Sequence, residues 1–422
     1  MRDHSKHIEV SRAEGVATLL EHCAFTPGVE EISLEQAFGR TLAVDATAQI
    51  TMPNCLTCNM DSIALHWSDF EGLDGGIPDI SQWKRGVEWQ FANTGVAMPE
   101  GFDTAIVIEN AVVSKDDTTL EQIILPPSRQ YAGTSSEGSR MRKGDPVAPA
   151  GTLITPLIAA ALGAAGYTTV PVMAKPRVAF IPTGNELVAM GEEIGKGKNI
   201  ETNSLVIRGK VEAWGGECKV WPIVRDNPQA IEAALREAAA SCDIIVLNAG
   251  SSKGSDDWGM EVLEEIGEVL YHETNHGPGH HSSGSVVDGV PVVGISGPPL
   301  GAAFTTDFYL KPLINYWFGK SPEPQTVTAR LAAEFPAGGP GSKPGNGKPS
   351  GEDRPSVVQE GKPFFAIQHL ELRYGDDGVL EAIPIPFRPN LVKANTSGAY
   401  YALNRSEKLP APGDLIEVEL RG

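Results

Sequence analysis

Three histidines and three glycines fall within ten residues of this chain, in the stretch NHGPGHHSSG at positions 275–284. The imidazoles of His276, His280 and His281 could ligate a metal ion, could face a phosphate, or could lie in a loop that is merely rich in histidine. A metal site needs three or four ligands in a defined geometry, which one flexible loop does not guarantee. The residues alone leave these three alternatives open.

A second stretch, NAGSSKGSDDW at positions 248–258, is rich in glycine and serine and directly precedes a predicted helix. Free backbone N–H groups and the helix dipole favour anions at such a place. The stretch therefore predicts phosphate contacts from Gly250, Ser251, Ser252 and Gly254.

The elements that must position these stretches alternate between strand and helix. Short runs rich in valine and isoleucine predict five buried strands, at 177–182, 217–224, 243–248, 268–273 and 290–295. Helical patterns lie between them, and the clearest is 227–241, with Asn227 as N-cap and an apolar face. This alternation predicts a parallel, doubly wound α/β sheet, in which ligands bind at the carboxyl ends of the strands. Both stretches would then belong to one rim of five loops.

The rest of the chain has other patterns. Residues 26–45 predict a helix that leads into a strand, residues 50–131 predict short strands and turns, and residues 144–172 predict a turn, a helix of small apolar residues and a strand. After Pro324 the chain is again rich in strand patterns. A Gly/Pro/Ser/Lys tract at 335–356 interrupts them and predicts a disordered loop.

Composition limits the classes of function. A chain of 422 residues is long enough for two to four domains, and its net charge of −20 disfavours nucleic acid polymers and anionic membranes as partners. No apolar signal segment or membrane-length run is present, so we expect a cytoplasmic protein. Five cysteines indicate reduced thiols, and the pair Cys55 and Cys58 favours small buried side chains over a redox or zinc role.

Seven motifs, in the same order along the chain, resemble those of the molybdopterin molybdenumtransferase family, the MoeA-type enzymes related to the gephyrin E domain. They are MPNCLTCNMDSIAL, ANTGVAMPEGFDTAIVIEN, GDPVAPAGTLITP, PRVAFIPTGNELV, VRDNPQAI, NAGSSKGSDDW and NLVKANTSGAYYAL. The resemblance runs from about residue 9 to the end.

The resemblance implies four domains and a homodimer. The domains are an elongated linking domain from residues 1–48 and 140–174, an inserted β domain at 49–139, the α/β molybdopterin-binding domain at 175–322, and a C-terminal β-barrel-like domain at 323–422, with the disordered loop near 338–355. The active site would combine the α/β domain of one subunit with the inserted domain of the other. The implied reaction takes adenylated molybdopterin and molybdate, cleaves the phosphoanhydride with Mg²⁺, inserts molybdenum into the dithiolene and releases AMP.

The resemblance also implies roles for individual residues. Asp61, Glu186, Asp226 and Asp257 match the family's acids and would be catalytic, the last three also as Mg²⁺ ligands. Alternatively, Asp226 stabilises a turn, Asp257 favours a helix N-terminus, and Asp61 is a solvated aspartate at a strand end. Beside the glycine-serine loop, the implied substrate-binding residues are Thr94, Gly95, Thr183, Gly184, Gly279, His280, Gly297 and Pro299. Thr94 and Gly95 could equally form a plain turn.

Several positions depart from the family pattern. The family's KPGKP loop becomes GPGHH, with Gly277 and His280 at the two lysine positions. For the histidine-rich stretch, the resemblance thus ranks a degraded phosphate loop first, inert surface histidines second and a metal site third. The family's PGNP becomes Ser296–Pro299 without the asparagine. Arg140 stands where the family carries an acid. These changes leave three hypotheses: a transferase with a retuned pocket, which the retained acids favour; a non-catalytic paralogue that binds a pterin cofactor, nucleotide or partner protein; and a metal carrier. Proteins of the molybdenum cofactor pathway are candidate partners.

Overall fold

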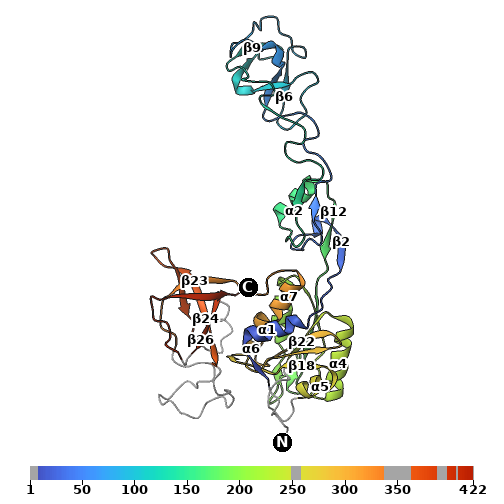
Figure 1. The fold of residues 1–422 in the computed structure, drawn as a ribbon, viewed down its shortest axis with the longest axis vertical. Coiled ribbons are helices and arrows are strands. Elements are labelled where there is room, and N and C mark those ends of the chain that lie inside the picture. The colour runs from blue at the N-terminus through green and yellow to red at the C-terminus, as the bar shows by residue number, and fades with distance from the viewer. Residues whose placement is uncertain (1–7, 249–257, 337–362, 387–396, 405–406, 422) are drawn as a thin grey trace. The chain divides into compact units, whose positions relative to one another are not determined.

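The computed structural model describes residues 8–248, 258–336, 363–386, 397–404 and 407–421 (Figure 1). The chain divides into two compact units, one made of residues 1–28 and 174–422 and the other of residues 29–173. The second unit is therefore an insertion between two segments of the first.

The first unit contains a six-stranded sheet in the order β16-β13-β17-β22-β21-β18. Its first four strands are mutually parallel and confirm four of the predicted strands; they are β16 (Glu217–Val220), β13 (Arg177–Pro182), β17 (Ile244–Asn248) and β22 (Val290–Ile295). Two short strands, β14 (Leu187–Val188) and β15 (Asn199–Ile200), pair beside this sheet.

Helices cover both faces of this sheet, as the doubly wound fold requires. On one side, α4 (Pro228–Ser241) and α5 (Gly259–Ile266) pack over a cluster that includes Ala179 and Ile181 of β13. Because strand side chains alternate, Val178 and Phe180 face the other side, where α3 (Asn203–Ala213) contacts β13 and α6 (Pro299–Thr305) contacts β22. Helix α4 confirms the predicted cap, since the Asn227 side chain accepts a hydrogen bond from the backbone N–H of Ala230.

The far edge of the sheet differs from the prediction. A strand that the sequence did not reveal, β21 (Ser283–Val287), runs antiparallel to β22 and also to β18 (Glu268–Tyr271). Its SGSVV sequence is typical of a loop, but the small residues are needed here. A Cβ on Gly284 would lie 2.3 Å from the ring of Tyr271. Because this ring packs closely against β21, the strand needs small residues and shows only a weak hydrophobic pattern.

The N-terminal segment packs against the same sheet. Strand β1 (Glu9–Val10) pairs in parallel with β19 (Glu273–Thr274), and α1 (Arg12–Glu21) begins with a capping box between Ser11 and Glu14. Helix α1 contacts β18, β21 and the helical segment made of η4 (Thr306–Leu310) and α7 (Lys311–Trp317). By contacts, residues 1–28 group with the α/β unit. The four-domain division and its boundaries remain predictions.

The C-terminal strands close into a five-stranded barrel, which confirms the predicted barrel-like domain. Its order is β24-β25-β23-β27-β26, and β26 pairs back onto β24. The strands are β23 (Thr326–Leu331), β24 (Phe365–Tyr374), β25 (Leu380–Pro384), β26 (Ala399–Asn404) and β27 (Leu415–Leu420). Strand β20 (His276–Gly277) joins the α/β domain to this barrel by pairing with β24. The predicted disordered loop near 338–355 lies outside the described residues.

The described residues of the second unit form three hydrophobic clusters. In one, β2 (Val29–Ser33) pairs with β12 (Thr169–Met173) beside α2 (Pro156–Ala164). The helix predicted within residues 26–45 is therefore wrong over 29–33, because register with β12 decides the local structure; only the short η1 (Leu34–Gln36) follows. The helix and strand predicted within residues 144–172 are confirmed.

The other two clusters lie in the inserted β region, where β6 (Trp89–Ala92), β5 (Ser62–Leu65) and β7 (Thr104–Val107) form a sheet. One cluster includes Ile63, Leu65 and Trp89, and the other includes Ala64 and Ala92. The remaining elements of the unit are β3 (Ala46–Thr47), β4 (Thr57–Cys58), η2 (Trp67–Asp69), η3 (Ile108–Asn110), β8 (Ala111–Val113), β9 (Leu120–Ile123), β10 (Thr134–Ser135) and β11 (Pro146–Ala148).

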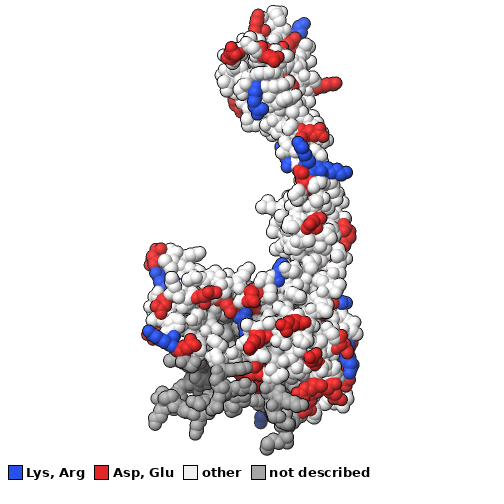
Figure 2. All heavy atoms as spheres, in the orientation of Figure 1, with Lys and Arg blue, Asp and Glu red and all other residues white. Residues whose placement is uncertain are grey.

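Acidic side chains are spread over the visible face of both units in Figure 2, in keeping with the net charge of −20. Among the described residues, no helix has both the length and the apolar character needed to cross a membrane.

A histidine between the barrel and the α/β domain predicts acid sensitivity. The ring of His369 lies against Phe304 and Tyr400, and burial lowers its pKa to about 4, with Arg421 and Lys210 adding to the decrease and Asp307 opposing it. In the unfolded chain this histidine binds a proton near pH 6.5, whereas in the folded protein it does so only near pH 4. Protonation therefore favours the unfolded state, and the free energy of unfolding should fall by about 2–3 kcal/mol as pH falls from above 6.5 toward 4.

We expect His369→Gln to flatten this part of the profile when urea unfolding is measured between pH 7 and 4. The exposed His22, changed to glutamine, is the matched control and should leave the profile as in the wild type. An unchanged profile in His369→Gln would contradict the assignment.

Candidate functional site

A cavity of about 410 Å³ lies at the carboxyl edge of the parallel strands. Its lining comes from three places in the chain: the β14–β15 region, the end of β17, and the turn after β22. The lining residues are Glu186, Leu187, Asn199, Ile200, Glu201, Thr202, Asn203, Asn248, Gly297, Pro298 and Pro299. The cavity therefore brings together three residues singled out from the sequence, namely Glu186, Gly297 and Pro299.

The turn after β13 positions Glu186. Thr183 anchors this turn, because its backbone N–H and its hydroxyl both donate to the carbonyl oxygen of Asn248, at 3.1 and 2.9 Å. Gly184 has φ of +149°, and a Cβ there would lie 2.6 Å from Oε2 of Glu186. Glycine is thus required at 184 for the Glu186 carboxylate to fold back over the turn.

Asp226 holds the same turn from the neighbouring loop. Its Oδ2 accepts a hydrogen bond from the backbone N–H of Asn185 at 2.8 Å, and its own N–H donates to Oδ1 of Asn185 at 3.3 Å. Asp226 does not belong to the cavity lining given above. Its contacts are those of a residue that stabilises the turn, and a role for it as a metal ligand stays a prediction.

Two asparagines that sequence reasoning missed connect the walls of the cavity. Nδ2 of Asn203 donates to Oδ1 of Asn248 at 2.7 Å and to the carbonyl oxygen of Gly297 at 2.8 Å. Both side chains are buried, and Oδ1 of Asn203 has no hydrogen-bond partner among the described residues. The run ETNS at 201–204, which precedes the apolar pattern of α3, has the composition of a helix N-terminus and could have drawn attention to Asn203.

Glu201 is a further acid at this cavity that the sequence did not reveal. Only 8% of it is exposed, and its Oε1 accepts a hydrogen bond from the backbone N–H of Ser204 at 2.8 Å. The carboxylate therefore caps the first turn of α3, where the helix dipole favours negative charge.

The histidine-rich stretch is not a flexible surface loop throughout. The interpretation of its histidines as surface residues is wrong for His276. His276 is 2% exposed, its Nε2 lies 2.9 Å from the hydroxyl of Tyr309, and the two rings stack. Burial lowers the pKa of His276 to about 3, so the ring is neutral near pH 7. It acts as a core residue.

Gly279 and His280, which the resemblance implies as substrate-binding residues, come next in the histidine-rich stretch. Gly279 has φ of +97°, and a Cβ there would lie 2.6 Å from Cγ2 of Thr305 in α6, so the loop packs closely on that helix. Nδ1 of His280 is hydrogen-bonded to the carbonyl oxygen of Thr274, and its Nε2 lies 3.7 Å from Oε2 of Glu273. Of the described residues, those that line the cavity do not include His280, and its substrate contact remains a prediction.

The second unit brings together three further predicted residues. Oδ1 of Asp61 accepts hydrogen bonds from the backbone N–H and the hydroxyl of Thr94, at 2.9 and 3.0 Å. The backbone hydrogen bond, followed by the hydroxyl, lowers the pKa of this exposed carboxyl group. Gly95, with φ of +73°, donates its N–H to the carbonyl oxygen of Cys58 at 2.8 Å. Asp61 is thus a fixed, ionised carboxylate that faces solvent.

The remaining predicted site residues belong to the glycine-serine loop. Gly250, Ser251, Ser252, Gly254 and Asp257 lie outside the described residues.

Comparison with known proteins connects both units to one family. Residues 10–166 match a family model described as the MoeA N-terminal region (domain I and II), and residues 179–316 match one described as a probable molybdopterin binding domain. Together these two regions take in most of the chain and include both Asp61 and Glu186.

Relatives and solved structures agree with these matches. A molybdopterin molybdenumtransferase of Staphylococcus epidermidis is 25% identical over 347 residues, covering 78% of this chain and 81% of that protein. One of Staphylococcus aureus (strain COL) is 26% identical over 342 residues, covering 78% and 80%. Two crystal structures of the molybdopterin biosynthesis MoeA protein of Pyrococcus horikoshii superpose with TM-scores of 0.76 and 0.72, at 22% and 21% identity, and each comparison covers 98% of this chain and 100% of the other. The chain belongs to the MoeA family, the molybdopterin molybdenumtransferases of molybdenum cofactor biosynthesis.

Proposed function

We propose that this protein is a molybdopterin molybdenumtransferase that consumes molybdate and adenylated molybdopterin and releases AMP. The observation that carries this proposal is the cavity at the carboxyl edge of the sheet, where the Glu186 carboxylate shares a polar wall with Asn203 and Asn248. In open α/β sheets this edge is the usual place for a nucleotide or pterin ligand. The family membership supplies the substrate class.

The cavity suits Mg²⁺, which prefers hard oxygen ligands. Glu186 offers a carboxylate, and Oδ1 of Asn203 is a buried amide oxygen without a hydrogen-bond partner among the described residues. We propose that these two oxygens hold the ion together with Asp226 and Asp257, the other acids implied by the resemblance. When bound, Mg²⁺ would neutralise charge on the phosphate oxygens of the substrate.

The chain's own groups would bind and orient the substrate. Thr183 and Gly184 fix the turn that carries Glu186, and Gly297 and Pro299 form the opposite wall. His280 stands where the family carries a lysine, but it does not supply a positive charge to the cavity. Its ring is directed to Thr274 and Glu273 instead. We therefore expect weaker binding of the phosphates than a lysine would give.

We propose a homodimer in which Asp61, held by Thr94, serves the α/β site of the other subunit. Light scattering at micromolar concentration should give the mass of two chains. A monomer under these conditions would contradict this arrangement.

The direct test is molybdate-dependent release of AMP from adenylated molybdopterin by the purified protein in the presence of Mg²⁺. We expect release that requires molybdate, with a competent member of the family as positive control. If AMP is not released while the control is active, the alternative is a non-catalytic paralogue that binds a pterin cofactor, a nucleotide or a partner protein. We also propose that the protein acts in the cytoplasm.

A further inference from the structure

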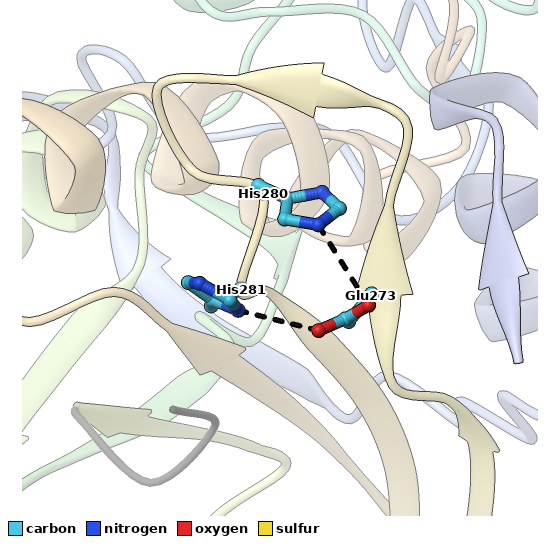
Figure 3. A group of neighbouring side chains, drawn as sticks. All are labelled: Glu273, His280 and His281. Carbon is cyan, nitrogen blue, oxygen red and sulfur yellow. Dashed lines mark ion pairs between the residues drawn. The ribbon is translucent and has the colours of Figure 1, made fainter. Parts of the chain in front are cut away.

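A second polar cluster lies in the part of the first unit where β19 and β20 connect the sheet to the barrel. It consists of Glu273, His280 and His281, and one potential ligand atom from each lies within 4.8 Å of the others. In Figure 3, Glu273 projects from a strand toward the two imidazole rings, which come from the loop that follows. Oε2 of Glu273 is 3.7 Å from Nε2 of His280, and Oε1 is 3.4 Å from Nδ1 of His281. The two carboxylate oxygens thus face two ring nitrogens.

The ring of His280 is held in one orientation. Its Nδ1 is hydrogen-bonded to the carbonyl oxygen of Thr274, and a carbonyl oxygen can only accept, so Nδ1 carries the proton. In the neutral ring, the lone pair of Nε2 then points toward the Glu273 carboxylate. Two acceptors at this separation repel each other unless a cation lies between them. A hydrogen bond from one imidazole nitrogen to a carbonyl oxygen is also how metal-ligating histidines are usually oriented.

The surroundings favour a cation. The side chain of Glu273 is 1% exposed, so its carboxylate is shielded from bulk water and attracts a nearby cation more strongly than an exposed carboxylate would. The His280 side chain is 14% exposed and its ring lies edge-on to Phe364, whereas the His281 side chain is 42% exposed. The cluster is therefore closed on the protein side and accessible from solvent through His281.

We propose that Glu273, His280 and His281 bind one divalent transition-metal ion of the Zn²⁺ class. Ligands around a tetrahedral Zn²⁺ lie roughly 3.3–3.5 Å apart, from bond lengths of about 2.0–2.1 Å. The distances from the carboxylate oxygens to the two imidazoles, 3.7 and 3.4 Å, therefore need only small adjustment. Two imidazole nitrogens and one carboxylate oxygen suit Zn²⁺, Co²⁺ or Ni²⁺, whereas Mg²⁺ and Ca²⁺ prefer oxygen ligands alone. A water molecule from the exposed side would complete the coordination.

The ion would stabilise the connection between two domains. Thr274 N–H donates to the carbonyl oxygen of His280 at 2.9 Å, and β20, between the ligands, pairs with β24 of the barrel. A metal that joins Glu273 to His280 and His281 would close this segment into a rigid loop. The site is separate from the Glu186 cavity and does not depend on the proposed transferase reaction.

The test is calorimetric titration of the untagged, chelator-treated full-length protein with ZnCl₂. We expect one ion per chain. His281→Gln should weaken binding at least about tenfold, because even the loss of a residue that only hydrogen-bonds to a metal ligand lowers affinity by that factor. Glu273→Gln should do the same. The exposed His22, changed to glutamine, is the matched control and should bind as the wild type does. MgCl₂ should not compete with ZnCl₂.

Co²⁺ provides a readout that does not depend on a correctly folded variant, because its visible absorption in the wild-type protein reports nitrogen and oxygen coordination. The proposal is overturned if the wild type binds no Zn²⁺. It is equally overturned if His281→Gln and the wild type bind with the same affinity, which would place the metal elsewhere in the chain.

Discussion

Changing Glu186 to glutamine should reduce molybdate-dependent AMP release by at least about 100-fold. Glutamine has nearly the same shape, so it can occupy the space beside Gly184 that the carboxylate fills. It lacks the negative charge that a divalent ion at the cavity requires. The substitution therefore removes a charge without disturbing the turn that Thr183 and Asp226 hold in place.

The matched control for Glu186 is Glu193, an exposed acid that follows it in the same segment. Glu193→Gln should retain wild-type activity, and both variants should melt at the wild-type temperature. An active Glu186→Gln enzyme would remove this carboxylate from the proposed chemistry. A loss of activity in both variants would mean that the segment as a whole, and not one carboxylate, is required.

Changing Asp307 to alanine should lower the free energy of unfolding of the first unit by about 3–5 kcal/mol. Asp307 pairs with Lys210 of α3, and its Oδ2 accepts a hydrogen bond of 2.7 Å from the hydroxyl of Tyr400 in β26. The side chains of Lys210 and Asp307 are 14% and 7% exposed. Desolvation lowers the pKa of Lys210, and Asp307 opposes this decrease. Without Asp307, a buried ammonium group would remain uncompensated.

A double-mutant cycle separates the charge from the packing. In a Lys210→Met background, the Asp307→Ala change should cost markedly less, because no buried cation is left behind. The control is the exposed pair of Arg208 and Glu212 on the same helix, where Glu212→Ala should cost less than about 1 kcal/mol. Urea unfolding followed by near-ultraviolet circular dichroism measures all variants. Equal costs of Asp307→Ala in both backgrounds would show that the two charges are not coupled.

The regular parts of the fold could be predicted because their signals are local. Four parallel strands and helix α4 carry their hydrophobic period and cap within a few residues, and the capping hydrogen bond of Asn227 lies where the sequence places it. The turn that carries Glu186 also follows directly from a predicted strand. These features need no knowledge of distant partners.

The elements that escaped prediction depend on contacts distant in sequence. Strand β21 has small residues because the ring of Tyr271 packs on Gly284, and His276 is buried because Tyr309 and Phe308 enclose it. Asn203 joins the cavity through Asn248 and Gly297, which come from other parts of the chain. The run ETNS at 201–204 indicates a helix N-terminus at Asn203, but no local pattern reveals the contacts with distant residues.

The pairing of β1 with β19 has a consequence for the order of events during synthesis. Glu9 leaves the ribosome early, but its partner Glu273 is made only after the whole second unit has emerged. Residues 29–173 are contiguous and contain their own hydrophobic clusters, so they can fold before the sheet that pairs with the N-terminal strand and α1 has been made. During that interval the apolar face of α1 is exposed to chaperones and proteases, and the N-terminal segment becomes protected only when β18 to β22 are complete.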